Sequence, residues 1–266
     1  MQTEALVNAA SPIIGQLGGT YFFTASTLAR GKELGLDGMR FYFLGRGAPL
    51  GDVEWPVVVS AFGFFNPKLI DKFWNSARTT LSAKDAAPIY RECTAQFGRE
   101  NFASVQGIAQ FCEAAELIVR SADPAGLPLF AGQLSLPLAD DLPGRAAQLV
   151  TILREHRGSA HVAAVIAVGL EPRVSAALGP EASWRFHGWT LDDGPEPTDA
   201  DRHLRIQAEE LTNRVVNKAF AVLTEAEGEA LLAGLRGMQA AMPTQAWAMK
   251  EAPEQSPTAN SDKLLA

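Results

Sequence analysis

The spacing of apolar positions along the chain predicts a protein built mostly from α-helices. Over long stretches apolar residues recur at every third or fourth position, which places them on one face of a helix. An aromatic segment at 39–44 is too short for its pattern to separate a strand from a buried helix. The predicted helices cover residues 7–15, 19–34, a stretch opening at 52, 68–76, 101–119, 145–168, 198–218 and 224–237.

Local end signals support several of these helices. Ser82 and Asp85 have the spacing of a capping box, and Asp52 is a plausible helix cap. Gly169 is expected to end the helix that begins near residue 145, because glycine is favoured just beyond a helix C-terminus. Thr198 is expected to cap the helix that follows it.

One stretch of the helix at 145–168 carries an unusual set of polar side chains. Residues 153–164 hold two of the four histidines of the chain, together with Arg154, Glu155 and Arg157. Polar groups buried in a helical core are costly unless they find partners. The sequence therefore points to this helix as the place where a site is to be sought.

Helical geometry divides these side chains between two faces. His156 lies on the apolar stripe with Leu153 and Ala160, whereas Arg154, Arg157 and His161 share another face. The two histidines are five residues apart, so their directions differ by about 140°, which disfavours one metal site formed by both. Two interpretations stay open: a core histidine with arginines that pair with carboxylates, or one wall of a polar pocket.

The pocket interpretation names candidate residues. His156 and His161 are the catalytic candidates, as acid–base groups or metal ligands, because histidine titrates near neutral pH. The sequence leaves the metal and the cofactor unknown. The candidate ligand-binding residues, which add a glycine-rich loop and an aromatic-rich first third of the chain, are Arg46, Arg154, Arg157, Tyr42, Phe64 and Phe65.

The loop around Arg46 does not have the spacing of a nucleotide-binding motif. Residues 45–51 read G-x-G-x-x-x-G, and Pro49 removes an amide donor that a phosphate would need. We interpret Arg46 as one polar wall of a pocket. The aromatic residues nearby fit either a core or a pocket for a flat ligand.

Composition and charge narrow the classes of partner. The chain has 266 residues, a formal net charge of −7 and two cysteines. An acidic chain is a poor match for nucleic acid or an anionic membrane surface. Two distant cysteines give no disulfide framework, and the N-terminus lacks the basic start of a signal peptide. With no apolar run long enough to span a bilayer, we expect a cytoplasmic protein without a membrane partner.

Six segments of the chain form a recognisable set: residues 33–38, 41–43, 46–51, 65–67, 153–163 and 188–189. In these segments the chain resembles an uncharacterised family, common in actinobacteria, of helix-turn-helix proteins. The resemblance covers most of residues 1–240 and implies no activity.

The resemblance implies a winged-helix-like segment after Gly188-Trp189, and this chain departs from that pattern. In the family the Gly-Trp pair is followed by a helix and a Leu-Thr-x-x-Gly turn. Here residues 190–198 read as a loop. Thr198 would match the threonine of that turn, but Asp201 stands where the family has glycine. Because a DNA reader needs a recognition helix and basic residues on phosphates, we expect DNA binding to be lost.

The sequence thus predicts a mostly α protein in three parts. These are a multi-helix ligand-pocket domain at 1–183, a reduced helix-turn-helix or winged-helix-like domain at 184–240, and a disordered tail at 241–266. The expected function is binding of an aromatic or anionic small molecule, with a homodimer as a further expected partner. The alternatives are an enzyme of a specialised pathway that uses His156 or His161, and a winged-helix transcription regulator.

Overall fold

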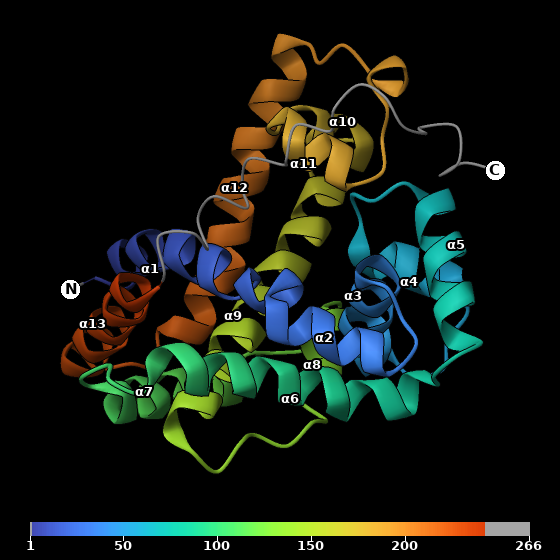
Figure 1. Cartoon of the computed structure of the whole chain (residues 1–266). Helices are drawn as coiled ribbons and strands as arrows, with labels where there is room; N and C mark the ends of the chain where they lie inside the picture. The colour runs from blue at the N-terminus through green and yellow to red at the C-terminus, as the bar shows by residue number, and fades with distance from the viewer. Residues whose placement is uncertain (1, 243–266) are drawn as a thin grey trace.

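The fold is mostly α, as the apolar spacing predicts. The computed structural model describes residues 2–242, in which thirteen α-helices and three short 3₁₀-helices occur and no strand is found (Figure 1). The α-helices are α1 (Thr3–Leu17), α2 (Ala25–Glu33), α3 (Gly38–Gly47), α4 (Trp55–Phe62), α5 (Pro67–Arg78), α6 (Ala83–Phe102), α7 (Ile108–Ser121), α8 (Pro128–Gln133), α9 (Leu142–Ala167), α10 (Pro172–Ala177), α11 (Glu181–Phe186), α12 (Asp199–Phe220) and α13 (Glu225–Ala241).

Helix α9 is the central element of the structure. It packs along α6, α7, α12 and α1, and α8 also lies against it. In Figure 1 the helices α3, α4 and α5 lie on one side of it, and α1, α7 and α13 lie on the other. The short helices α10 and α11, with the first half of α12, form a projection at one end. Both cavities discussed below are lined in part by residues of α9.

The ends of α9 follow the expected capping chemistry. The Asp141 side chain accepts a hydrogen bond from the Gly144 amide, 2.8 Å away, at the N-terminus. At the C-terminus Gly169 adopts φ +80°, and the Leu170 amide donates to the Val165 carbonyl. This reverse turn is the Schellman motif, which satisfies carbonyls that the helix leaves open. The predicted stop at Gly169 is confirmed.

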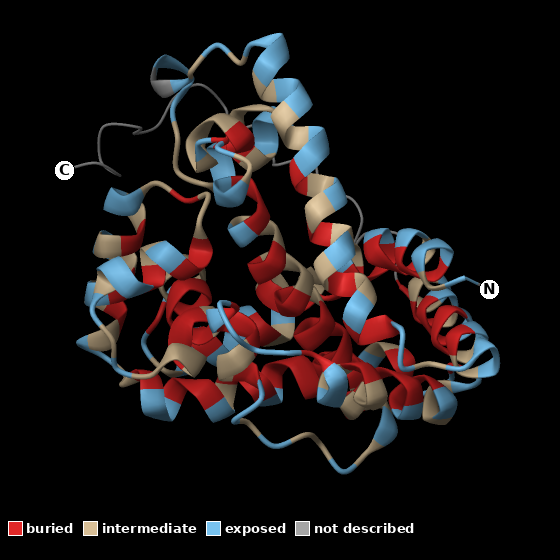
Figure 2. Ribbon diagram, turned by 180° about the vertical axis from the view of Figure 1, so that it is seen from behind, coloured by how far each residue is buried: buried red, intermediate tan, exposed pale blue. Residues whose placement is uncertain are grey.

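The core is rich in aromatic rings and extends through most of the molecule. Trp74, Phe41 and Phe43 are fully buried, and the Phe43 ring stacks on that of Phe73 at 5.6 Å. Figure 2 shows buried residues concentrated around α9 and the helices that flank it, while the projection of α10 to α12 is mostly exposed or intermediate. A small second cluster of apolar residues supports that projection, made of Ala164, Val165, Leu170 and Ala208.

Two helix predictions need correction, and one segment that the sequence left open is now assigned. The predicted helix at 101–119 is two helices, because the chain turns after α6 and Gly107, at φ +74°, starts α7. The predicted helix at 19–34 is broken at Thr24, whose extended backbone separates a 3₁₀-turn from α2. The aromatic segment at 39–44 is helical and belongs to α3.

The glycine-rich loop and its flanking cap also differ from the prediction. Residues 45–47 complete α3, and Ala48–Leu50 form a 3₁₀-helix. Helix α4 starts later than expected, with Glu54 at its N-cap. Asp52 instead accepts a hydrogen bond from the Ala83 amide at the start of α6. Ser82 caps α6 as predicted, since its side chain accepts from the Asp85 amide.

The last two helices pack into the same core as the first ones. Thr198 and Thr224 each form a complete capping box, at the starts of α12 and α13. Val216 and Leu235 belong to the main apolar cluster together with Val7. That cluster therefore includes residues on both sides of the predicted 183/184 boundary, which stays a prediction. The predicted disordered tail at 241–266 starts too early, because Ala241 still belongs to α13, and its residues 243–266 lie outside the described part of the chain.

No helix in the described part of the chain is both long and apolar enough to cross a membrane.

Candidate functional site

A pocket of about 440 Å³ lies beside the middle of α9. Its walls come from α1, α3, α4, α8, α9, the end of α11 and α12, together with the segment that joins α4 to α5. Elements distant in sequence therefore meet at one cavity.

The pocket gathers most of the residues singled out from the sequence. All six predicted ligand-binding residues and one of the two catalytic candidates line it. They are Tyr42, Arg46, Phe64, Phe65, Arg154, Arg157 and His161.

A buried carboxylate fixes two of these arginines. Glu155, with 1% of its side chain exposed, accepts from Nε and Nη2 of Arg46 at 3.0 and 3.1 Å. It also accepts from Nη1 of Arg154 at 2.6 Å. The remaining Nη1 of Arg46 donates to the Tyr42 hydroxyl at 3.0 Å. This two-pronged Arg46–Glu155 pair is a strong, geometrically specific contact that joins α3 to α9.

Both members of that pair are held in their charged forms. Burial alone would raise the pKa of Glu155, but attraction to Arg46 and then Arg154 keeps it below its ordinary value. Burial would likewise lower the pKa of Arg46, and the Glu155 charge raises it instead. The pocket floor is therefore ionic at neutral pH.

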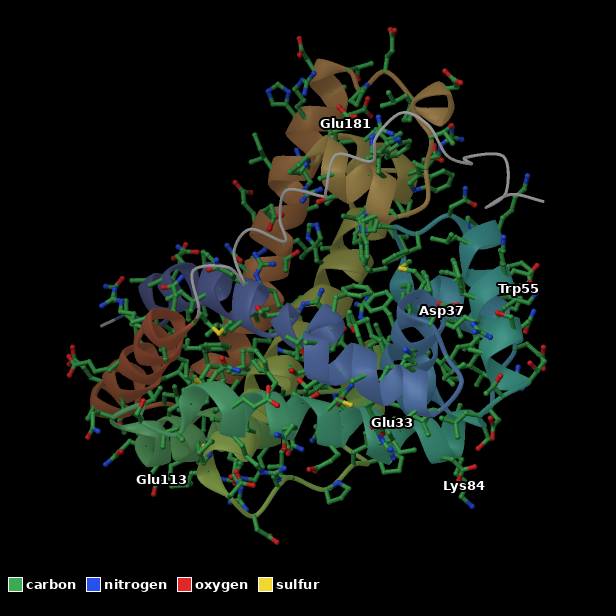
Figure 3. All side chains as sticks on the ribbon, in the orientation of Figure 1. Glu33, Asp37, Trp55, Lys84, Glu113 and Glu181 are labelled. Carbon is green, nitrogen blue, oxygen red and sulfur yellow. The ribbon has the colours of Figure 1, made fainter. Side chains whose placement is uncertain are left out.

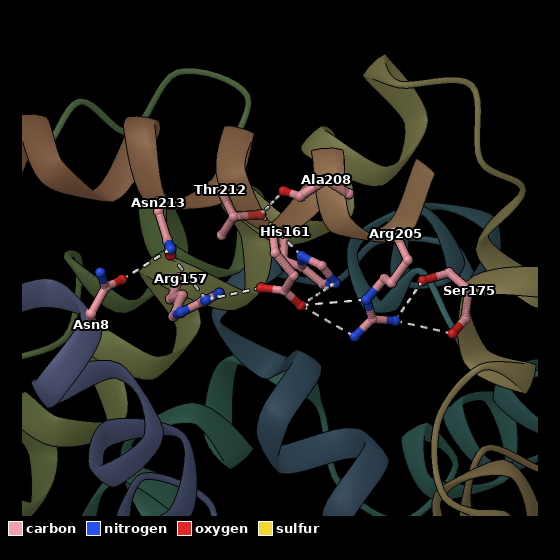
Figure 4. A network of polar contacts seen from close by, with 9 residues as sticks. Asn8, Arg157, His161, Ser175, Arg205, Ala208, Thr212 and Asn213 are labelled. Atoms are coloured by element: carbon pink, nitrogen blue, oxygen red, sulfur yellow. Dashed lines mark hydrogen bonds and ion pairs between the residues drawn. The ribbon is translucent and has the colours of Figure 1, made fainter. Parts of the chain in front are cut away.

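A second polar network forms the wall between α9 and α12 (Figure 4). Nη2 of Arg157 donates to Oε2 of Glu209 at 3.0 Å and to the Asn213 side chain at 3.1 Å. On the other side of the carboxylate, Arg205 donates from Nε and Nη2 to Oε1 at 3.3 Å. Nδ1 of His161 lies 3.0 Å from the Thr212 hydroxyl. Glu209 is thus shared by two arginines, one on each helix.

The two histidines of the pocket are uncharged at neutral pH. Burial lowers the pKa of His161 to about 4, against the opposing pull of Glu209. Burial, with Arg46 nearby, also lowers the pKa of His187 to about 4. Nε2 of His161 and Nδ1 of His187 are buried without a hydrogen-bond partner among the described residues. Nε2 of His161 lies 3.7 Å from Oε1 of Glu209, and both nitrogens are neutral polar atoms enclosed in the pocket wall.

Aromatic rings form the apolar part of the lining. The guanidinium of Arg46 lies over the Phe62 ring, 4.4 Å from its centre. Phe65 contacts Phe186 and His187 edge-on, at 5.6 and 4.6 Å between ring centres. The Phe64 ring lies 5.8 Å from that of His161. A flat ligand could pack against these rings.

The electrostatic balance of this pocket favours an anion. Three arginines and one carboxylate, Glu209, are among the described residues that line it, and a second carboxylate, Glu155, bonds two of the arginines from outside the lining. Arg154 makes one hydrogen bond within the described residues, although a guanidinium has five donors. Donors therefore remain on its guanidinium for a carboxylate or phosphate oxygen.

His156 does not join the other candidates. It is buried and lines a different cavity, on another face of α9, with the small residues Ala160 and Ala164. The two histidines, whose directions from the helix axis differ by about 140°, thus line two different cavities. Glu116 accepts hydrogen bonds from Arg120 and Arg145 and lines neither cavity.

The described residues contain no group of three or more His, Cys, Asp or Glu side chains able to hold a metal ion. Burial raises the pKa of Cys93 to about 11 and that of Cys112 to about 12, so both thiols are protonated at neutral pH. The use of His156 or His161 in catalysis stays a prediction.

Sequence reasoning missed several residues of the lining. Phe62 lay in a recognised aromatic cluster without being chosen, whereas Phe186 and His187 belong to a short segment with no helical period to place them. Glu209 sits in a charged stretch of α12 that resembles an ordinary solvated face. In the sequence, neither Arg154 nor Arg157 has an acidic residue three or four positions away in the helix, which is the signal that points to a carboxylate on another element.

Comparison with known proteins gives a match to one family. Residues 7–186 match the model of a family described as a helix-turn-helix family. No curated protein and no solved structure matches the chain. The matched range includes every residue of the pocket except His187 and Glu209.

Proposed function

The chain belongs to this helix-turn-helix family, and from the geometry of its pocket we propose that it binds a small anionic aromatic molecule. The observation that carries the proposal is the convergence of three arginines and a set of aromatic rings on one cavity of about 440 Å³. Such cavities, mostly apolar with a few convergent polar groups, are typical ligand sites.

The three arginines have different roles in the proposed binding. Arg46 is neutralised by the two oxygens of Glu155 and helps to shape the floor. Arg154 and Arg157 have 26% and 23% of their side chains exposed, so they present the accessible positive charge. A ligand carboxylate bonded by these two would place its ring against Phe64 and Phe65.

We expect 2-naphthoate to bind this pocket, and its neutral analogue 2-naphthamide to bind at least tenfold more weakly. Replacing Arg154 by methionine should weaken 2-naphthoate binding by about 10- to 100-fold, since a charge-assisted hydrogen bond is lost. Isothermal titration calorimetry measures both affinities. The matched control is Arg120→Met. It removes an exposed arginine of α7 that pairs with Glu116 and does not line the pocket.

Two results would contradict the proposal. One is the absence of saturable 2-naphthoate binding at millimolar concentration. The other is equal affinity for the acid and the amide, which would show that the arginines do not distinguish a charged ligand from a neutral one. The expected homodimer is independent of this test and stays a prediction.

A second candidate function, DNA-binding regulator, is favoured by the family match itself. Other observations oppose it. Between Trp189 and the start of α12 the structure has a 3₁₀-turn and no α-helix, so the helix expected after Gly188-Trp189 is absent from this segment. This segment lies outside the residues that match the family model, 7–186. Exposed acidic side chains, including Glu33, Asp37, Glu113 and Glu181, are spread over the outer surface (Figure 3).

A gel-shift experiment with the upstream region of the protein's own gene separates the two candidates. Ligand binding alone predicts no complex that survives an excess of unrelated competitor DNA. A specific complex whose affinity falls steeply between two salt concentrations would instead establish a regulator that contacts phosphates.

A further inference from the structure

The cavity that contains His156 is separate from the candidate site. It has a volume of about 510 Å³ and lies between α9, α12 and the connection from α7 to α8. It shares no lining residue with the pocket around Arg154. Helix α9 supplies a wall to both.

The lining of this second cavity is mainly aliphatic. The exceptions in the described lining include His156, Ser121 and two exposed charged residues, Asp123 and Lys218. The aliphatic walls that the argument uses are Leu127, Ala160, Ala163, Ala164, Leu211 and Val215. Such walls favour an uncharged, largely apolar ligand.

His156 supplies one buried polar group to these walls. Only 2% of the residue is exposed, and its Nδ1 has no hydrogen-bond partner among the described residues. The ring packs against Phe130, with ring centres 4.7 Å apart. Buried polar atoms nearly always have a partner, so this nitrogen is an exception that asks for an explanation.

The cavity walls are held in place independently of any ligand. The Ser121 hydroxyl donates to the Ala219 carbonyl at 2.8 Å, which fastens the end of α7 to α12. Ala164 and Ala219 are buried, at 2% exposure each. Small side chains on two packed helices thus leave space between them that larger residues would fill.

We propose that this cavity is a second binding site, which takes an uncharged apolar or aromatic molecule bearing one hydroxyl group, bonded to His156. A hydroxyl can both donate and accept a hydrogen bond, so a single hydroxyl can bond Nδ1 of the neutral imidazole in either tautomer. Burial lowers the pKa of His156 to about 4, which keeps the ring neutral at physiological pH.

The proposal predicts that 2-naphthol binds the protein and that His156→Leu weakens this binding about tenfold, because one buried hydrogen bond is lost. Ala163→Phe should abolish it by filling the cavity. Ala163 is exposed, so this variant leaves the core intact. Both affinities are measured by isothermal titration calorimetry, after circular dichroism has confirmed the helical content of each variant.

The Arg154→Met variant is the matched control, since it alters the other pocket. It should leave 2-naphthol binding unchanged, and Ala163→Phe should leave 2-naphthoate binding unchanged. The proposal is overturned if 2-naphthol does not bind saturably, or if Ala163→Phe binds it as the unchanged protein does. Loss of 2-naphthol binding in Arg154→Met but not in His156→Leu would also overturn it, by placing the compound in the first pocket.

Discussion

Replacing Glu155 by glutamine is expected to lower the free energy of unfolding by about 3–5 kcal/mol. The change keeps the shape of the side chain but removes the charge that two arginines share. Arg46, whose side chain is 10% exposed, would then be a buried cation without a counter-ion. Urea unfolding followed by circular dichroism measures the effect.

Three companion variants separate charge from shape in this test. Glu181→Gln breaks an exposed pair with Arg185 and should cost less than about 1 kcal/mol. Arg46→Met combined with Glu155→Leu should recover much of the loss, since an apolar pair leaves no charge buried. Arg154→Met alone should cost less than Glu155→Gln, because Arg46 keeps its carboxylate. Equal stability of Glu155→Gln and Glu181→Gln would show that the buried pair does not stabilise the fold.

Replacing Gly98 by alanine is expected to cost about 3 kcal/mol or more. A Cβ atom at this position in α6 would lie 2.1 Å from the backbone carbonyl oxygen of Pro143, at the start of α9. A backbone atom cannot rotate away as a side chain can, so the two helices would have to separate. Thermal and urea unfolding both report the change.

Gly158→Ala in α9 is the matched control for Gly98→Ala. Here the nearest atom to an added Cβ is Oε2 of Glu155, at 4.0 Å, so there is room. Alanine is the better helix former, and a gain of about 0.5–1 kcal/mol is expected. If both variants lost stability alike, close packing at Gly98 would not be the reason for the loss, because Gly158 has room for a Cβ atom.

The apolar spacing was a reliable guide where helices are long and capped. Helix α9 was predicted within a few residues at both ends, and α12 started at its predicted Thr198 cap. The break between α6 and α7 was missed because apolar residues continue across it. Helix α6 ends at Phe102, residues 103–107 are not helical, and α7 starts at Ile108 after the left-handed Gly107. The aromatic segment of α3 was ambiguous because six residues are too few for the apolar pattern to separate a strand from a buried helix.

The candidate site could be outlined from the sequence but not assembled. Helical geometry correctly assigned Arg154, Arg157 and His161 to one face and His156 to another. The resemblance to a helix-turn-helix family was confirmed by the family match. Nothing local, however, indicates that Arg46 bonds Glu155, since 109 positions separate them. Long-range pairs of this kind follow from the packing of α3 on α9, which periodicity does not encode.

The position of α9 between two cavities limits how this protein can vary in length. A residue inserted between His156 and His161 would rotate the rest of the helix by 100° and advance it by 1.5 Å. The second histidine would then leave its pocket, and the alanines beyond it would no longer line theirs. Insertions and deletions are therefore tolerable in the connections before Leu142 and after Ala167, while the interval between the two histidines has to stay at five residues.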